Sequence, residues 1–183
     1  MASYETLFQI GDTFEAFVCR GLDTEKEAVE RFSRRLSMNL TCPTVERLEQ
    51  VNARYHLLIA GELWCPDCQL NITALKTLNR LQPRIDMAII SKARAEHDLK
   101  DRLQLERIAI PLVLVLDENY ELLGTFVEQP TSVIDRGESA RDDYRNGRYL
   151  EETITEVLAI IEKKEALCRK VGATPPALQE LAS

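Results

Sequence analysis

The chain is poor in the features that mark several classes of protein. Among its 183 residues there are 7 glycines, 7 prolines and 2 histidines, with no internal repeat or low-complexity segment, which is the composition of an ordinary globular domain. The longest apolar run, Ala109–Leu116, is far shorter than the roughly 20 residues that cross a bilayer, so we expect no membrane association. Met1–Ile10 carries acid rather than base and has no apolar centre, so we expect no signal peptide and a cytoplasmic protein.

A basic surface is also lacking. The chain has 30 acidic residues against 23 lysines and arginines, a net charge of −7. The basic residues Arg31, Arg34 and Arg35 alternate with acids, which is typical of a solvated helix face. Since nucleic-acid binding needs clustered positive charge, we expect no nucleic-acid partner.

The five cysteines do not form a disulfide framework, because their number is odd and their spacing irregular. Only Cys65 and Cys68 form a C-x-x-C pair, in the segment GELWCPDCQLNI. Such a pair binds zinc, closes a structural disulfide or exchanges electrons. Zinc needs four ligands, and the remaining cysteines and histidines are isolated, so we expect no metal. A structural disulfide is disfavoured in a reducing cytoplasm.

The pattern of apolar residues predicts a helical N-terminal region. Apolar residues at helical spacing from Leu7 to Val18 predict one helix that ends at Gly21. Thr24 and Glu27 form a capping-box pattern that predicts the start of a second helix. That helix should bury Ala28, Phe32 and Leu36. A loop over 39–44 and a short helix with Val45, Leu48 and Val51 on one side should follow.

From Tyr55 the periodicity changes to that of a mixed α/β domain. The expected order is strand (55–60), helix (69–81), strand (84–91), helix (93–107), strand (110–117), turn, strand (121–128) and further helices. The last helix should bury Ile154, Val157, Leu158 and Ile161, and Cys168 continues that apolar stripe. The fold class is therefore α/β, with a central mixed four-stranded sheet and helices on both faces.

The position of the cysteines favours redox chemistry. Cys65 follows a buried strand and precedes a helix, so its sulfur should lie at the helix N-terminus, where free N–H groups and the dipole favour a thiolate. Pro66 suits the first helical turn, because its missing N–H costs nothing there. Cys68, about one turn further on, should be the more buried thiol and should resolve a mixed disulfide made by Cys65. The charge of Asp67 should oppose thiolate formation.

The segment ELWCPDC, followed by helix, strand, helix and AIPLVLVLD, resembles the thioredoxin superfamily over about residues 55–167. The resemblance implies a thioredoxin-like fold and a cis bond between Ile110 and Pro111, with Pro111 facing the cysteines. It also implies that Trp64 flanks a substrate groove, with a half-buried aromatic as the alternative role. One departure is Ile59, which stands where thioredoxins bury a carboxylate that relays protons. Glu62 is a possible substitute, although a solvent-exposed acid is the simpler interpretation.

We therefore expect a thiol–disulfide oxidoreductase in which Cys65 and Cys68 are catalytic and no cofactor is needed. The residues expected to contact substrate are Trp64, Pro66, Asp67, Ile110 and Pro111. Expected partners are disulfide-containing proteins and an upstream dithiol reductant, and the sequence does not indicate an oligomeric state. The alternative is a redox-sensing or partner-binding module with little turnover.

The expected organisation has three parts. Residues 1–53 form a helical extension that packs on the core, residues 54–170 form the thioredoxin-like domain, and residues 171–183 form a tail. The helical extension has an alternative role as a docking surface for a partner or a second copy of the chain.

Overall fold

The computed structural model describes residues 2–172, without the side chains of residues 38, 39 and 168–172. In chain order its elements are α1 (Tyr4–Gln9), α2 (Phe14–Cys19), α3 (Asp23–Asn39), α4 (Cys42–Glu49), β1 (Tyr55–Ala60), α5 (Pro66–Leu81), β2 (Ile85–Ile90), α6 (Lys92–Asp98), β3 (Leu112–Asp117), β4 (Leu122–Val127), α7 (Thr131–Arg136), the 3₁₀ turn η1 (Gly137–Ala140), α8 (Arg141–Arg145) and α9 (Leu150–Gly172). The predicted tail lies outside the described residues, apart from residues 171 and 172, which belong to α9. The side chain of Cys168 also lies outside them.

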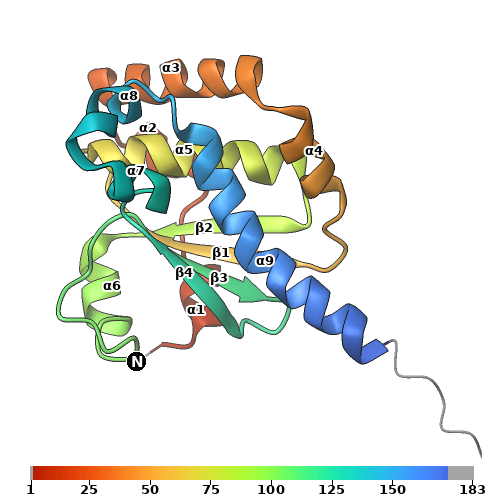
Figure 1. Cartoon of the computed structure of the whole chain (residues 1–183). Helices are drawn as coiled ribbons and strands as arrows, with labels where there is room; N and C mark the ends of the chain where they lie inside the picture. The colour runs from red at the N-terminus through yellow and green to blue at the C-terminus, as the bar shows by residue number, and fades with distance from the viewer. Residues whose placement is uncertain (1, 173–183) are drawn as a thin grey trace, which may run out of the picture.

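The sheet has the strand order β2-β1-β3-β4, with β1 parallel to β2 and antiparallel to β3, and β3 antiparallel to β4. Helices α5 and α9 cover one face, α3 packs outside α5, and α1 and α6 lie on the other face (Figure 1). All side chains of β1 and β3 are buried, as expected for central strands covered on both faces. The predicted mixed four-stranded sheet with helices on both faces is therefore confirmed.

The N-terminal helices belong to the same hydrophobic core as the sheet. Leu7 of α1, Phe17 of α2 and Phe32 of α3 are buried within it. The predicted burial of Ala28, Phe32 and Leu36 is confirmed, as is that of the four apolar residues of α9. The predicted division between extension and domain at residue 53 stays a prediction.

The prediction of one N-terminal helix is wrong, because α1 and α2 are separate. Between them the backbone of Asp12 exchanges two hydrogen bonds with Ile89 of β2, with N···O distances of 2.7 and 2.9 Å. Thr13 then caps α2 by accepting from the N–H of Ala16. A pairing partner far along the chain thus interrupts the local helical pattern, and Ile10 is left 56% exposed.

Other predicted boundaries also shift. Helix α3 begins at Asp23, and the Glu25 carboxylate, rather than that of Glu27, accepts from the N–H of the capping residue Leu22. Helix α4 takes in part of the expected loop, since Pro43 is compatible with a first helical turn.

Helix α6 ends at Asp98, well before the predicted Arg107. The chain then turns, and Gln104 adopts a positive φ of 54°. Leu99 is nevertheless buried, and Leu103 packs against the core, as the apolar pattern indicated.

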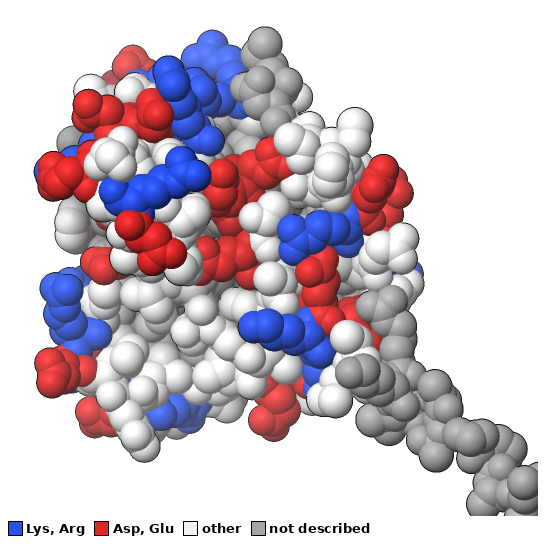
Figure 2. All heavy atoms as spheres, in the orientation of Figure 1, with Lys and Arg blue, Asp and Glu red and all other residues white. Residues whose placement is uncertain are grey.

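Acidic and basic side chains are interspersed over α3, α8 and α9 on the face that Figure 2 shows. Among the residues that the structure describes, no helix is both long and apolar enough to cross a membrane.

Candidate functional site

The two cysteines lie where β1 leads into α5. Residues 61–64 connect the strand to Cys65, which is the N-cap of α5, and Pro66 occupies the first helical turn. The helix starts at Pro66 rather than at the predicted Gln69, so Cys68 lies within it. Gly61 permits this close approach, because a Cβ there would stand 2.7 Å from the Ile72 Cδ1 and 3.3 Å from the Cys68 Sγ.

The two thiols differ in exposure. Cys65 is 8% exposed and Cys68 is fully buried, which confirms the predicted asymmetry. Both are free thiols, so the pair is described in its reduced form. Only Cys65 is therefore open to attack by, or on, a molecule in solution.

Their pKa values are displaced in opposite directions. A hydrogen bond from the Cys68 thiol is the largest cause that lowers the pKa of Cys65 to about 7, and the N–H groups of Cys68 and Asp67 contribute. Burial and the charge of Asp67 act against this lowering, as predicted for Asp67. The same hydrogen bond, together with burial, strongly raises the pKa of Cys68. At neutral pH Cys65 is therefore about half ionised, whereas Cys68 keeps its proton.

Cys65 also contacts the start of β3. Its Sγ lies 3.6 Å from the carbonyl oxygen of Ile110, and the bond between Ile110 and Pro111 is cis. Ile110 is 7% exposed and Pro111 is buried. The Pro111 carbonyl accepts a 2.8 Å hydrogen bond from the N–H of Glu128, which follows β4. The structure thus brings the predicted Ile110–Pro111 segment against Cys65.

The other residues predicted to contact substrate, which lie close to Cys65 in the chain, differ in exposure. Trp64 is 63% exposed, so it is not the half-buried aromatic of the alternative interpretation, and Pro66 is exposed as well. Asp67 is partly buried, and its Oδ1 has no hydrogen-bond partner. The Nε2 of Gln129 lies 3.5 Å from its Oδ2, at the limit of a hydrogen bond.

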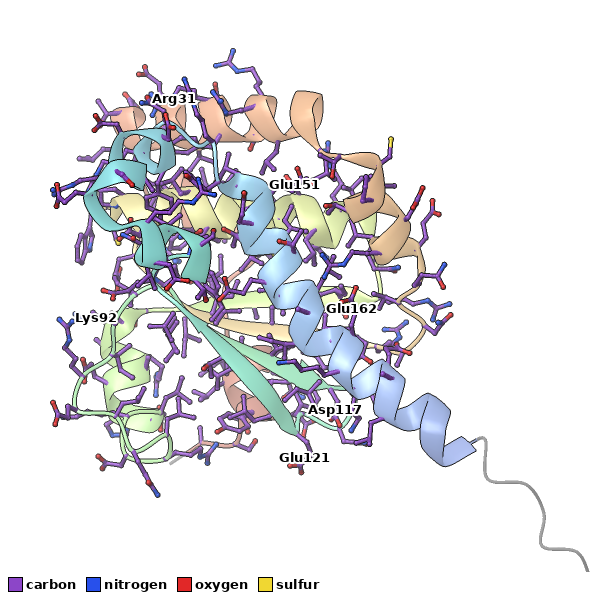
Figure 3. All side chains as sticks on the ribbon, in the orientation of Figure 1. Arg31, Lys92, Asp117, Glu121, Glu151 and Glu162 are labelled. Atoms are coloured by element: carbon purple, nitrogen blue, oxygen red, sulfur yellow. The ribbon has the colours of Figure 1, made fainter. Side chains whose placement is uncertain are left out.

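The position of the usual buried carboxylate is apolar here. Ile59 is fully buried in β1. Glu62 lies two residues after β1, and its carboxylate accepts a 2.8 Å hydrogen bond from the N–H of Lys92 at the start of α6. Figure 3 labels Lys92 at that point. Glu62 therefore binds one N–H of the first turn of α6, whose N-cap is Ser91.

Sequence reasoning missed a buried polar cluster behind the cysteines. Asn71 is fully buried in α5, and its amide donates to the carbonyl oxygens of Asp67 and Glu128 and to the hydroxyl of Tyr144. Its Oδ1 accepts a 2.6 Å hydrogen bond from Thr153 of α9. The one available signal is a polar residue on the apolar side of the predicted helix. Nothing in the sequence pairs it with residues so far along the chain.

Tyr144 brings this cluster close to the thiols. Its side chain is buried in α8. Burial and the nearby charge of Asp67 raise the pKa of Tyr144, so its hydroxyl stays protonated. The first turn of α5 is thus held from behind by neutral hydrogen-bonding groups.

No group of three or more histidine, cysteine, aspartate or glutamate side chains is arranged to hold a metal ion within the described part of the chain. Of the two carboxylates beside the cysteines, that of Glu62 accepts from a backbone N–H, and that of Asp67 has one oxygen without a hydrogen-bond partner. The two sulfur atoms can form and break a disulfide.

Comparison with known proteins gives one family. A family model described as thioredoxin matches residues 11–141. A protein of unknown function from Pseudomonas aeruginosa, PA1234, has a solved structure with 58% sequence identity and a TM-score of 0.88, covering 90% of this chain and 99% of that one. A crystallised HIV epitope scaffold is 57% identical, with a TM-score of 0.87, covering 88% of this chain and 99% of that chain. No protein with a curated description matches. With its cysteine pair at the start of α5 and its match to the family model over most of its length, the chain belongs to the thioredoxin family.

Proposed function

We propose that the protein is a thiol–disulfide oxidoreductase that reduces disulfides through Cys65 and Cys68. The observation that supports the proposal is that the two sulfurs differ in exposure and in pKa. Cys65 is accessible and has a pKa of about 7, whereas Cys68 is fully buried and keeps its proton. A nucleophile with a pKa near ambient pH is the efficient attacking thiol in disulfide exchange.

The first step is attack by the Cys65 thiolate on one sulfur of a substrate disulfide. That disulfide breaks, a mixed disulfide forms at Cys65, and the other substrate sulfur leaves as a thiolate that takes a proton from water. Trp64 and Pro66 are exposed on either side of Cys65 and would contact the substrate. The backbone around Ile110 and Pro111 borders the same sulfur and would guide an extended segment of substrate.

The second step is resolution by Cys68. Its thiol gives up its proton, and its sulfur attacks the Sγ of Cys65, which releases the second substrate sulfur as a thiol. The product is a Cys65–Cys68 disulfide and a substrate that has gained two electrons and two protons. Another dithiol, from an upstream reductant in a reducing compartment such as the cytoplasm, would return the pair to its reduced form.

The test is reduction of insulin disulfides with dithiothreitol as the electron source. We expect the wild-type protein to accelerate precipitation of the insulin B chain, and we expect Cys65→Ser to abolish the acceleration. Cys19→Ser is the matched control, because Cys19 is an exposed thiol at the end of α2. Equal rates for wild type and Cys65→Ser would contradict the proposal.

A redox-sensing module with little turnover is the second candidate. The observation that favours it is the buried, apolar Ile59, since no carboxylate on β1 assists removal of the Cys68 proton. A slow second step would leave the mixed disulfide with one partner long-lived. Cys68→Ser traps that species covalently in either case, but only this candidate predicts a stable adduct with the wild-type protein.

A further inference from the structure

A cavity of about 160 Å³ lies beside the cysteine motif, between the N-terminal helices and the sheet. Its walls come from the α2–α3 turn, from residues 61–64 and from the end of β2. By this measure one water needs ~10–15 Å³, so the cavity holds several waters or the end of a long side chain. Trp64 is part of the wall and immediately precedes the nucleophile Cys65.

The segments that form the cavity walls are closely packed against one another. A Cβ on Gly21 would stand 2.1 Å from the Cδ2 of Leu63, so the α2–α3 turn is packed directly against the loop that carries the cysteines. On the opposite side the backbone of Asp12 is paired with Ile89. The N-terminal helices therefore shape a surface that touches the redox site.

The charged groups that line the cavity are three acids and one base, namely Asp12, Glu25, Glu62 and Arg20. Both terminal nitrogens of Arg20 donate to the two carboxylate oxygens of Asp12, and the charge of Arg20 also interacts with that of Glu62. Three acids and one base leave the lining with a net charge of −2.

The carboxylates of Glu25 and Glu62 are each oriented by a backbone N–H. The Glu25 Oε2 accepts from Leu22 and the Glu62 Oε1 accepts from Lys92, both at 2.8 Å. The positions of both negative charges are thereby fixed at the edge of the cavity.

We propose that this cavity is a substrate subsite that takes the side chain of a lysine or arginine close to the target cysteine. The proposal rests on the proposed oxidoreductase function and assigns its substrate class: disulfides flanked by a basic residue. Two oriented carboxylates attract an ammonium or guanidinium group, and the exposed indole of Trp64 covers its aliphatic stem. An acidic residue at the same place in a substrate is repelled.

The experiment uses three peptides that differ in one residue next to the cysteine: lysine, norleucine or glutamate. Each carries its cysteine as a mixed disulfide with thionitrobenzoate, so that one turnover of the pre-reduced full-length protein, which ends as the Cys65–Cys68 disulfide, releases a coloured thiolate. We expect the lysine peptide to have the highest second-order rate constant, by roughly two- to fivefold over norleucine for interactions of partly exposed charges, and the advantage to shrink in high salt.

The matched variants are Glu62→Gln and Glu25→Gln, which remove one charge but keep an oxygen that accepts the backbone N–H. Each should lower the rate with the lysine peptide more than the rate with the norleucine peptide. Glu121→Gln is the control, because Glu121 is exposed and lies at the end of the sheet away from Lys92 (Figure 3). Equal effects of all three substitutions would indicate overall charge and would overturn the subsite.

A binding measurement separates this inference from the proposed function. Trp64 is the single tryptophan of the chain, so its fluorescence reports on the cavity. The same peptides with S-methylcysteine cannot react, and the lysine form should bind more tightly to wild type than to Glu62→Gln. If the lysine peptide binds more tightly but no disulfide is reduced, the proposed oxidoreductase function is contradicted and the proposed subsite is supported. Reduction without any charge preference in rate or binding would defeat the subsite alone.

Discussion

The amide of Asn71 donates a 2.8 Å hydrogen bond to the hydroxyl of Tyr144, although the two residues are 73 positions apart in the chain. With the carbonyl of Glu128 and the hydroxyl of Thr153, this contact joins the cysteine-bearing helix to α8, to the end of β4 and to α9. The amide also holds the carbonyl of Asp67, the residue between the two cysteines that precedes Cys68. One buried side chain thus fixes the first turn of α5 from behind.

Replacement of Asn71 should therefore destabilise the protein. We expect Asn71→Leu to lower the free energy of unfolding by about 2–5 kcal/mol, because the substitution leaves several buried polar groups without partners. Thr153→Val removes a single hydrogen bond of the cluster at nearly constant volume and should cost about 1 kcal/mol. Urea unfolding of both variants tests this, and equal losses would show that Asn71 acts only through its contact with Thr153.

The pKa of Cys65 predicts how its reactivity depends on pH. Alkylation by iodoacetamide should be half-maximal at pH about 7 and should fall about tenfold for each pH unit below that. Cys68→Ala removes the main hydrogen-bond donor and should move the midpoint upward, whereas Cys68→Ser keeps a donor and should move it less. Thiolate absorbance at 240 nm provides the measurement, and a midpoint unaffected by Cys68→Ala would contradict the assignment.

The same lowering of the pKa has a consequence for stability. A thiolate favoured by the fold adds stability to the reduced protein as the pH rises from about 7 toward the ordinary cysteine value of 9.0, and this gain is lost as the pH falls through 7. Cys65→Ser should lack this rise. Thermal unfolding of both forms under reducing conditions between pH 6 and about 8.5 checks it.

Asp67→Asn should lower the pKa of Cys65, because the negative charge of Asp67 opposes the thiolate. The alkylation midpoint should therefore shift to lower pH, and the asparagine should keep the first turn intact. Glu138→Gln, which removes a charge from the exposed η1 turn, is the control and should leave the midpoint in place. An unchanged titration in Asp67→Asn would sink this prediction.

Gly61→Ala should disturb the packing around Cys68. The new methyl group would stand 2.7 Å from the Cδ1 of Ile72 and 3.3 Å from the Sγ of Cys68, and overpacking of this kind costs about 1–3 kcal/mol. Adding Ile72→Val removes the closer atom and should recover part of the stability. If the double variant is no more stable than Gly61→Ala, the clash is not with Ile72.

The sequence was informative where local chemistry decides the structure. The apolar runs at 55–60 and 110–117 predicted buried strands, and Tyr55–Ala60 and Leu112–Asp117 are such strands. The order strand, cysteine, proline, helix predicted that Cys65 lies at the start of a helix, as it does. The Ile110–Pro111 segment was found through the family resemblance and lies against Cys65 as expected. The lower exposure of Cys68 followed from its place one turn into the helix.

The features that the sequence did not predict depend on contacts between residues far apart in the chain. The break between α1 and α2 depends on Ile89, which is a neighbour of Asp12 in space only. The buried cluster needed Asn71 and Tyr144 to be brought together by the whole fold. A helical period also continues through residues 99–107, yet the chain turns there, since Leu105 bonds back to Lys100 in place of a helical partner. Periodicity describes which side chains face inward and does not record where the backbone turns.

The Asp12–Ile89 bridge covers part of the outer edge of β2. The outer edge of β2 would otherwise present a row of free backbone groups, the kind of edge on which a second chain adds a strand and begins to aggregate. The Asp12 N–H donates to the Ile89 carbonyl and the Asp12 carbonyl accepts from the Ile89 N–H, which satisfies part of that edge, and α1 and α2 pack against β2. Removal of the first 22 residues to obtain a minimal redox domain would expose the backbone groups at the edge of β2. That edge could then pair with a strand of another chain, and the truncated protein should aggregate.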